Sequence, residues 1–220
     1  MLPSTSPIFL EDHCPPMFSR NLFWNWTRAA DVAIQPCPAG STGLARWTCH
    51  PDLLQFQNFQ PDMSDCKSDE ISDLETRVRE QDPENVLVSS LERFTEKGAS
   101  KLYGGDLEAV VNVLKAVLNR LQYLLQTKAE KFYNKESFLQ EIFQNVLRTG
   151  SNLMANQSLP AWKDLSRSRR IKVASNLIQT LEEHAFLLLD VLDQPEVIQE
   201  STNEIGNNPS FVILEAHYKV

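Results

Sequence analysis

The chain has 220 residues, of which 42% are hydrophobic and 23% charged, an ordinary balance for a globular protein with a buried core. Its net charge of −8 argues against nucleic-acid binding and against docking on anionic lipid, because both need clustered Lys and Arg. The longest wholly apolar run, Ala185–Leu189, is far shorter than the roughly 20 residues that cross a membrane. The first residues, MLPSTSPIFLEDHC, lack the basic and apolar regions of a secretory signal. We therefore expect no nucleic-acid partner and no membrane span, and a role outside the cell would require a longer chain.

All the cysteines lie near the amino terminus: Cys14, Cys37, Cys49 and Cys66. An even number of cysteines in a short segment is typical of a module held by disulfides, which is too small to be stabilised by its core alone. Many prolines and glycines lie between them, which indicates short strands and turns. Residues 10–68 are therefore predicted to form a small module with two disulfides in an oxidising compartment. The cysteine positions alone allow three pairings.

A zinc site is the alternative use of these cysteines. His13-Cys14 and Cys49-His50 are adjacent pairs of residues that can bind zinc. Structural zinc sites, however, usually space their paired ligands as C-x(2–4)-C or H-x(3–5)-H, and this spacing is missing. We therefore expect disulfides, no metal and no cofactor.

Two further features of the sequence are candidate surface sites, namely glycosylation sequons and aromatic side chains. Asn25-Trp26-Thr27 and, further along the chain, Asn156-Gln157-Ser158 are open N-glycosylation sequons, so Asn25 and Asn156 are candidate glycosylation sites. Phe23, Trp24 and Trp47 are expected to be exposed and to contact a peptide or an adhesion protein, although some aromatic side chains must pack against the disulfides. The module is thus also a candidate for partner binding.

From about residue 69 the sequence pattern predicts helices. Asp69–Gln81 is polar and is expected to be a helix or a linker. A helix with Asp82 as N-cap and Pro83 in its first turn should end near Gly98. After the break at Gly104-Gly105, Asp106 is predicted to cap a long helix with a continuous apolar face over residues 107–125.

Two more helices follow. One covers residues 138–147 and should end near Gly150, and Pro160 leads into a last long helix that Pro195 stops. Four successive amphipathic faces indicate a helical bundle over residues 69–205. Residues 210–220 then read as a β-strand without a partner in this chain, so residues 206–220 are expected to begin another domain. The predicted fold class is mainly α: a disulfide-stapled β/turn module, a helical bundle and the start of a strand.

The sequence contains no pattern that predicts catalysis. A G-x-S-x-G elbow, a Gly-rich phosphate loop and an H-E-x-x-H zinc motif are all missing. His184 follows Glu182-Glu183, which we interpret as a solvated helix edge. Arg167-Ser168-Arg169-Arg170 has the pattern of a convertase cleavage site, but its place at a helix start favours a solvent-facing basic turn. We expect that the chain is not an enzyme.

The spacing of the first module resembles the hormone-receptor motif of adhesion receptors. The shared features are a tryptophan before Pro36-Cys37-Pro38, the run Gly43-Leu44-Ala45 leading to Cys49, and a final Asp62-Met63-Ser64-Asp65-Cys66. Leu102-Tyr103-Gly104-Gly105-Asp106-Leu107, Trp162-Lys163-Asp164 and residues 181–188 are similar to stretches of latrophilin-type receptors, although His184 stands where a glycine is expected. The resemblance implies the pairs Cys14–Cys49 and Cys37–Cys66, and it makes the helical part subdomain A of a GAIN domain.

The resemblance also implies a role. The chain would be an extracellular piece of a latrophilin-like adhesion G-protein-coupled receptor, on the outer side of the plasma membrane, acting as a scaffold or spacer in adhesion and signalling. Its partners would be the remaining parts of the same receptor, GAIN subdomain B and the seven-helix bundle, together with an extracellular adhesion protein. The resemblance assigns the family's cleavage and signalling chemistry to no residue of this sequence.

Overall fold

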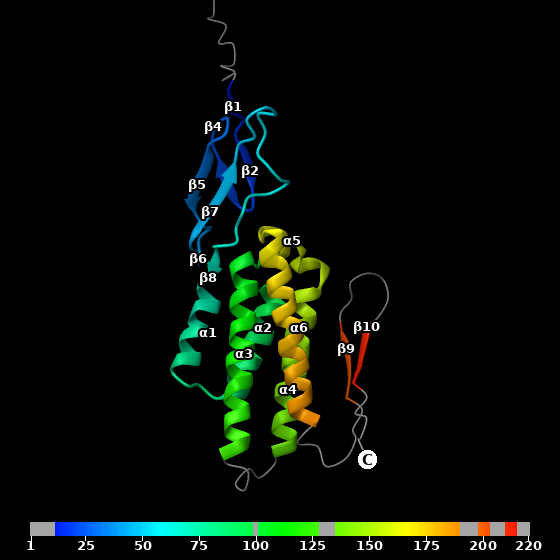
Figure 1. Cartoon of the computed structure of the whole chain (residues 1–220). Coiled ribbons are helices and arrows are strands. Elements are labelled where there is room, and N and C mark those ends of the chain that lie inside the picture. Colours follow the sequence, from blue (N-terminus) through cyan, green and yellow to red (C-terminus); the bar gives the residue numbers. More distant parts are fainter. Residues whose placement is uncertain (1–11, 99–100, 128–134, 190–197, 203–209, 215–220) are drawn as a thin grey trace, which may run out of the picture.

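A computed structural model of the protein describes residues 12–98, 101–127, 135–189, 198–202 and 210–214. Figure 1 shows an elongated molecule in which a module of short strands stands on one end of a helical bundle. The predicted fold class, mainly α with a small disulfide-stapled strand module before the helices, is confirmed. No helix in the described part of the chain has an apolar stretch long enough to cross a bilayer.

The module consists of short antiparallel strand pairs. The pairs are β1 with β4, β2 with β3, β5 with β7 and β6 with β8. Their bounds are β1 His13–Cys14, β2 Met17–Ser19, β3 Leu22–Trp24, β4 Thr27–Arg28, β5 Val32–Pro36, β6 Ser41–Thr42, β7 Leu44–Thr48 and β8 Lys67–Ser68. The longest pair, β5–β7, aligns Ile34 with Arg46. Figure 1 places β1 and β4 far from the helices and β6 and β8 next to them.

Two disulfides and three aromatic rings form the core of the module. The disulfides join Cys14 to Cys49 and Cys37 to Cys66, the pairs that the family resemblance implies. Around them Trp24 packs edge-on against Trp47 with ring centroids 5.4 Å apart, and Phe56 stacks on Trp47 at 4.5 Å. Each indole N–H donates to a carbonyl inside the module, those of Ser19 and Gln57. These rings are therefore core residues.

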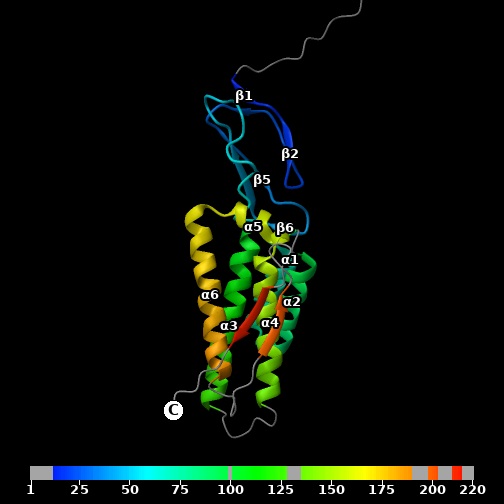
Figure 2. The same ribbon diagram turned by 90° about the vertical axis from the view of Figure 1, so that its right-hand side faces the viewer.

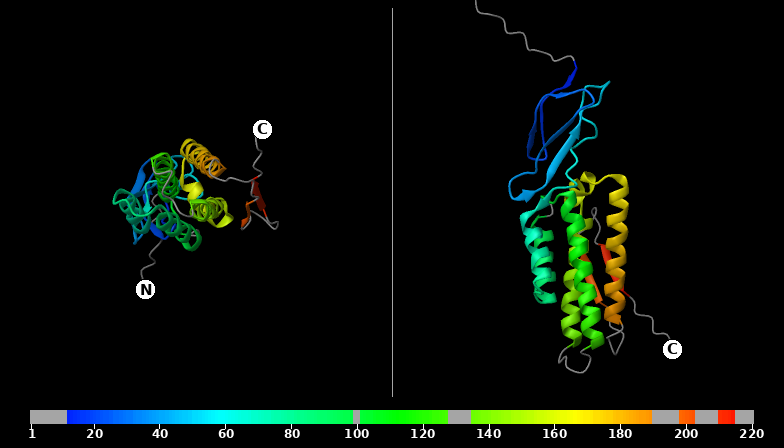
Figure 3. Two further views of the ribbon diagram at one scale, coloured as in Figure 1. Left: turned by 90° about the horizontal axis from the view of Figure 1, so that it is seen from below. Right: turned by 60° about the vertical axis from the view of Figure 1, so that its left-hand side comes forward.

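The second part is a bundle of helices that run along its long axis (Figures 1 and 3). Its elements are α1 Asp69–Arg79, α2 Glu84–Gly98, α3 Gly104–Thr127, α4 Lys135–Met154, the 3₁₀ turn η1 Asn156–Ser158, α5 Leu159–Asp164 and α6 Arg167–Leu189. The polar segment that follows the module is thus a helix, α1, which buries Ile71 and Leu74. A second core fills the space between the helices, and α3 contributes eight of its residues: Leu107, Ala109, Val110, Val111, Val113, Leu114, Val117 and Leu121. This continuous stripe is the one that the apolar spacing predicts.

Three predicted helix boundaries are wrong, for physical reasons that the structure shows. α2 begins at Glu84, and the carbonyl of Pro83 accepts the backbone N–H of Leu87, so Pro83 and not Asp82 occupies the N-cap position. Asp106 lies inside the first turn of α3, where its carboxylate accepts the backbone N–H of Tyr103 just before the helix, so it does not occupy the N-cap position. Gly150 does not end α4, which continues to Met154. A Cβ at Gly150 would come within 3.0 Å of Leu181, so the glycine allows α4 and α6 to approach closely.

The last strand has a partner, contrary to the prediction. β10 (Ser210–Leu214) pairs antiparallel with β9 (Ile198–Thr202), in a register that aligns Val212 with Glu200. Figure 2 shows this pair beside the bundle, near α4. Sequence reasoning missed β9 because its residues, IQEST, carry little apolar alternation. Pro195 and residues 215–220 of the predicted segments lie outside the described residues.

Candidate functional site

The feature that stands out in this structure is the joint between the module and the bundle. β8 runs directly into α1, so no linker separates them. The start of α3 packs against the same stretch of backbone: a Cβ at Gly105 would lie 2.4 Å from the carbonyl oxygen of Cys66, and one at Gly104 would lie 3.0 Å from Ser64 and from Asp164. A Cβ at Gly105 would clash with this carbonyl and one at Gly104 would crowd its neighbours, so the two glycines allow the module backbone to approach the end of the helix.

Asp106 connects α3 to the last strand of the module. It is buried, and its carboxylate accepts hydrogen bonds from the backbone N–H of Ser68 at 2.7 Å, the hydroxyl of Ser68 at 2.8 Å and the backbone N–H of Tyr103 at 2.9 Å. Burial raises the pKa of Asp106, against the effect of these donors. Because a helix N-terminus favours a negative charge, Asp106 stabilises the start of α3. Its hydrogen bonds to Ser68 connect α3 to the module.

Asp164, the last residue of α5, is the centre of the joint. Its side chain is fully buried, and it accepts the guanidinium of Arg20 at 2.6 Å, the side-chain amide of Gln60 at 2.8 Å and the backbone N–H of Gly104 at 3.1 Å. Arg20 and Gln60 come from the module, Gly104 from the bundle. Burial raises the pKa of Asp164 to about 7, while Arg20 pulls it down. One carboxylate thus binds both parts.

The turn between β2 and β3 positions Arg20 for this contact. Arg20 and Asn21 both have positive φ angles, 52° and 60°, which is the backbone of a two-residue type I′ hairpin turn. The tip therefore projects Arg20 toward the bundle, where it also donates to the carbonyl of Leu102 at 2.9 Å and lies over the ring of Tyr103 at 5.4 Å. The guanidinium is thus held from several sides.

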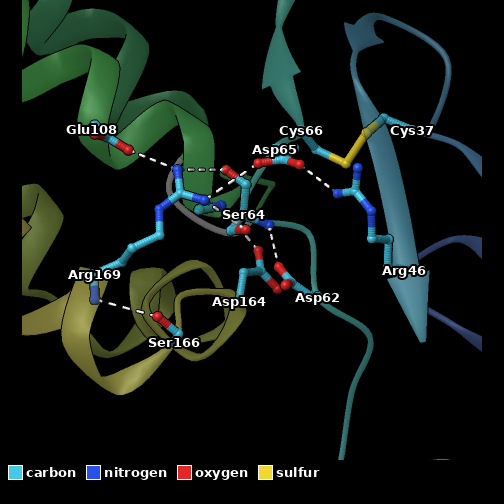
Figure 4. A network of polar contacts seen from close by, with 11 residues as sticks. Cys37, Arg46, Asp62, Ser64, Asp65, Cys66, Glu108, Asp164, Ser166 and Arg169 are labelled. Carbon is cyan, nitrogen blue, oxygen red and sulfur yellow. Dashed lines mark hydrogen bonds and ion pairs between the residues drawn. A yellow bond between two sulfur atoms is a disulfide. The ribbon is translucent and has the colours of Figure 1, made fainter. Parts of the chain in front are cut away.

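Arg169 forms a second polar contact across the joint (Figure 4). Ser166 caps the start of α6 by accepting the backbone N–H of Arg169. The guanidinium then donates to the hydroxyl of Ser64 at 2.8 Å and to Glu108 on α3 at 2.8 Å, and pairs with Asp65 at 3.3 Å. The carboxylates of Glu108 and Asp65 raise the pKa of Arg169 against the effect of burial, and the side chain joins α6, α3 and the module.

Asp65 extends this network into the module sheet. It also accepts a hydrogen bond from Arg46 on β7, and this bond, together with Arg169, lowers the pKa of Asp65. Cys66 follows Asp65 in the chain and is bonded to Cys37, so the network is anchored to a disulfide (Figure 4). The ion pairs continue from α6 to a strand of the module without a break.

The structure corrects the interpretation of the basic turn. Arg169 does not simply face solvent, since it is the hub of the network just described. Arg170 donates from Nε to the carbonyl of Trp162 and from Nη2 to the carbonyl of Leu165, which ties the start of α6 to α5. Sequence reasoning missed the role of Arg169 because its acceptors lie 61 to 105 residues away in the chain.

His184 is also placed differently from the prediction. It is buried, not solvated, and its Nδ1 hydrogen bonds with the carbonyl of Thr180 at 2.7 Å. Burial lowers its pKa, and its Nε2 has no hydrogen-bond partner among the described residues. Glu182 is exposed beside it. The histidine is therefore a neutral core residue of α6.

The candidate partner-contact residues separate into two groups. Trp24 and Trp47 are only 1% and 3% exposed, so the expectation that they face solvent is wrong; they fill the module core between the disulfides. Phe23 is 59% exposed. The two sequon asparagines, Asn25 and Asn156, are both exposed.

The zinc alternative is wrong, because all four thiols are engaged in disulfides. Among the residues that the structure describes, no group of three or more His, Cys, Asp or Glu side chains is placed to hold a metal ion. His13 instead contacts its neighbour Asp12 at 2.7 Å.

Comparisons with known proteins agree with this architecture. Residues 11–69 match the hormone receptor domain (HRM) family, and residues 67–188 match the family described as AGRL2-4 GAIN subdomain A. Latrophilin Cirl of Drosophila ananassae is 29% identical over an alignment of 243 positions, gaps included, which covers 86% of this chain and 14% of that protein. Adhesion G protein-coupled receptor L1 of Mus musculus and of Homo sapiens is 29% identical over 193 residues, covering 83% of this chain and 13% of each receptor.

The chain thus spans about one seventh of the length of the curated relatives that it matches. The hormone receptor domain precedes GAIN subdomain A in this chain, in the order in which the structure stacks its module and its bundle. The chain belongs to the GAIN family, and its module and bundle correspond to the HRM and GAIN subdomain A regions of latrophilin-like adhesion receptors.

Proposed function

We propose that this chain is a rigid, non-catalytic extracellular spacer of a latrophilin-like adhesion G-protein-coupled receptor. In this proposal residues 10–68 are the hormone-receptor-motif module, residues 69–205 are GAIN subdomain A and residues 206–220 begin subdomain B. The spacer lies outside the plasma membrane and transmits position between ligand-binding domains on one side and the rest of the receptor on the other.

The buried carboxylate of Asp164 is the observation that carries the proposal. Domains of one chain move relative to each other by default unless their interface resists it. Here, separation would remove Arg20 and Gln60 from a carboxylate that has no solvent exposure. Withdrawing the hairpin tip would break the hydrogen bonds of Arg20 and Gln60 to this carboxylate, and a hydrogen bond to a charged group contributes about 1.5–3 kcal/mol, so the motion is opposed.

The Arg169 network adds a second fixed point. A single contact would still allow rotation about it, whereas two separate contacts restrict rotation as well. Asp106 with Ser68 supplies a third contact, at the point where β8 enters α1. Three separate polar contacts, all at the end of the bundle, support a fixed orientation of the module.

The alternative role, recognition of a peptide or an adhesion protein through the cysteine-rich module, has less support. Of the three aromatic residues that suggested it, only Phe23 is exposed. The outer face of the β5–β7 pair does expose Val32, Ile34 and Leu44, but nothing described there selects a partner.

A distance measurement between spin labels tests the proposed rigidity. Labels are placed at Ile34 on the module and Ile178 on α6, both of which are exposed. They are introduced through non-cysteine amino acids, because new thiols would exchange with the disulfides. The native chain should give one narrow distance distribution, and an Arg20→Ala, Arg169→Ala double variant a broader one.

Arg120→Ala is the matched control, because Arg120 pairs with Glu84 at 2.9 Å within the bundle, away from the joint. It should leave the distance distribution unchanged. A native distribution as broad as that of the double variant would overturn the proposal.

A further inference from the structure

The β2–β3 hairpin that carries Arg20 also presents two phenylalanines to solvent. Phe18 and Phe23 are direct cross-strand partners, and they are 69% and 59% exposed. Trp24, next to Phe23 in the strand, points into the module core, so Phe23 points outward by the alternation of a strand. Direct cross-strand partners lie about 4.5–5.5 Å apart at Cβ, so the two rings form one apolar platform.

A glycosylation sequon begins two residues after this platform. Asn25 follows β3 directly, is exposed, and lies about 7 Å beyond Phe23 along the extended strand. Its side-chain oxygen Oδ1 accepts the backbone N–H of Trp26 at 2.8 Å, and the hydroxyl of Thr27 donates to its backbone carbonyl at 3.0 Å. With Oδ1 held against the backbone, Nδ2 is directed away from it.

We propose that Asn25 carries an N-linked glycan whose first N-acetylglucosamine packs on the platform of Phe23 and Phe18. This rests on the proposed extracellular role, because the chain must pass through the secretory route to be glycosylated. Nδ2 forms a bond to C1 of a lipid-diphosphate-linked oligosaccharide, the bond from C1 to the diphosphate oxygen breaks, the lipid diphosphate leaves and the amide loses one proton.

The chemistry of the two surfaces is complementary. One face of the sugar ring presents C–H groups with a small positive charge, and the face of a phenyl ring is negative. Covering the platform in this way shields apolar surface that an unmodified chain would leave in water. Because the glycan is covalently attached to Asn25 beside the platform, the sugar can pack on the phenyl rings without any free ligand.

The second sequon provides an internal comparison. Asn156 is also exposed, but it lies in the 3₁₀ turn η1, and the residue two positions before it is Met154, which has no aromatic face. A glycan at Asn156 therefore has no such platform. Its effect on stability should not depend on Phe23.

The test uses the whole chain, secreted from animal cells behind an added signal peptide and trimmed to a single N-acetylglucosamine at each site. Mass spectrometry should find Asn25 occupied. Asn25→Gln should lower the unfolding temperature by about 2–4 °C, the shift expected from one ordinary aromatic contact in a chain of this size. In a Phe18→Ser, Phe23→Ser background, the same change should have no effect.

Asn156→Gln is the control, and its effect should be equal in both backgrounds. In NMR spectra the sugar protons at Asn25 should be shifted upfield by the phenyl rings. An unmodified Asn25, or an Asn25→Gln effect that persists without the phenylalanines, would overturn the proposal. So would capture of a protein partner through Phe23 by the fully glycosylated chain. The spin-label distances do not depend on the glycan, so they test the spacer role separately.

Discussion

The ion pair between Arg20 and Asp164 is the contact on which rigidity of the joint most depends, and a double-mutant cycle measures it. The two side chains are 13% and 0% exposed and meet at 2.6 Å. At pH 8, where Asp164 is mostly ionised, Asp164→Asn leaves a buried guanidinium without its counter-charge and should cost about 3–5 kcal/mol. Because Arg20→Met and Asp164→Asn remove the same interaction, the double variant should cost about 1–3 kcal/mol less than the sum of the two single variants.

The pH dependence of these variants supplies an independent check. Burial raises the pKa of Asp164 from the ordinary 3.8 to about 7 in the folded chain. Between these values the folded state holds a proton that the unfolded state has lost, so this group's contribution to stability is full below about pH 4 and declines as pH rises to about 7. Arg20 lowers the pKa of Asp164, so Arg20→Met should raise this pKa further and extend the decline in stability above pH 7.

Urea unfolding followed by tryptophan fluorescence reports both parts of the molecule, because Trp24 and Trp47 lie in the module and Trp162 in the bundle. Unfolding free energies of the native chain, both single variants and the double variant would be compared at pH 6 and pH 8. Strictly additive costs at pH 8, together with an Asp164→Asn variant that keeps the native pH dependence, would refute the reasoning about this pair.

Three further predictions concern other parts of the structure. Burial lowers the pKa of His184, so on acidification the unfolded chain binds a proton at this residue before the folded chain does, and stability should fall as pH drops below about 6.5. His184→Leu should remove this loss of stability, which is measured by comparing urea midpoints at pH 7.5 and 5.5. Gly105→Ala forces a Cβ against the carbonyl of Cys66 and should cost about 1–3 kcal/mol, whereas an unchanged unfolding temperature would contradict the close approach. Replacing Cys37 and Cys66 by serine opens a loop with a sequence separation of 29 and should cost about 3.5–4 kcal/mol, seen by calorimetry as earlier unfolding of the module.

Much of the architecture could be predicted because it depends on local patterns. The even number of cysteines before residue 70 indicates a stapled module, and the apolar stripe of α3 indicates a long helix packed on its neighbours. Each of these features is contained in a short stretch of sequence. Family resemblance implied the two disulfide pairs, which cysteine positions alone leave open.

The joint could not be predicted, because its members come from distant parts of the chain. Arg20 and Asp164 are 144 residues apart, and nothing in the sequence near either one indicates the other as its partner. The glycines at the start of α3 were interpreted as a helix break, whereas they also allow backbone of the module to approach the helix. Trp24 was expected at the surface because composition does not tell which side of a short strand faces a core so small.

The most direct test of the rigid spacer is whether the module and the bundle tumble as one body. Residual dipolar couplings of backbone amides, measured for the native chain in a weakly aligning medium, give an alignment tensor for each part separately. We predict that residues 12–68 and the helices share one tensor in magnitude and direction. Two tensors of different magnitude would show that the module moves freely on the bundle and would contradict the account.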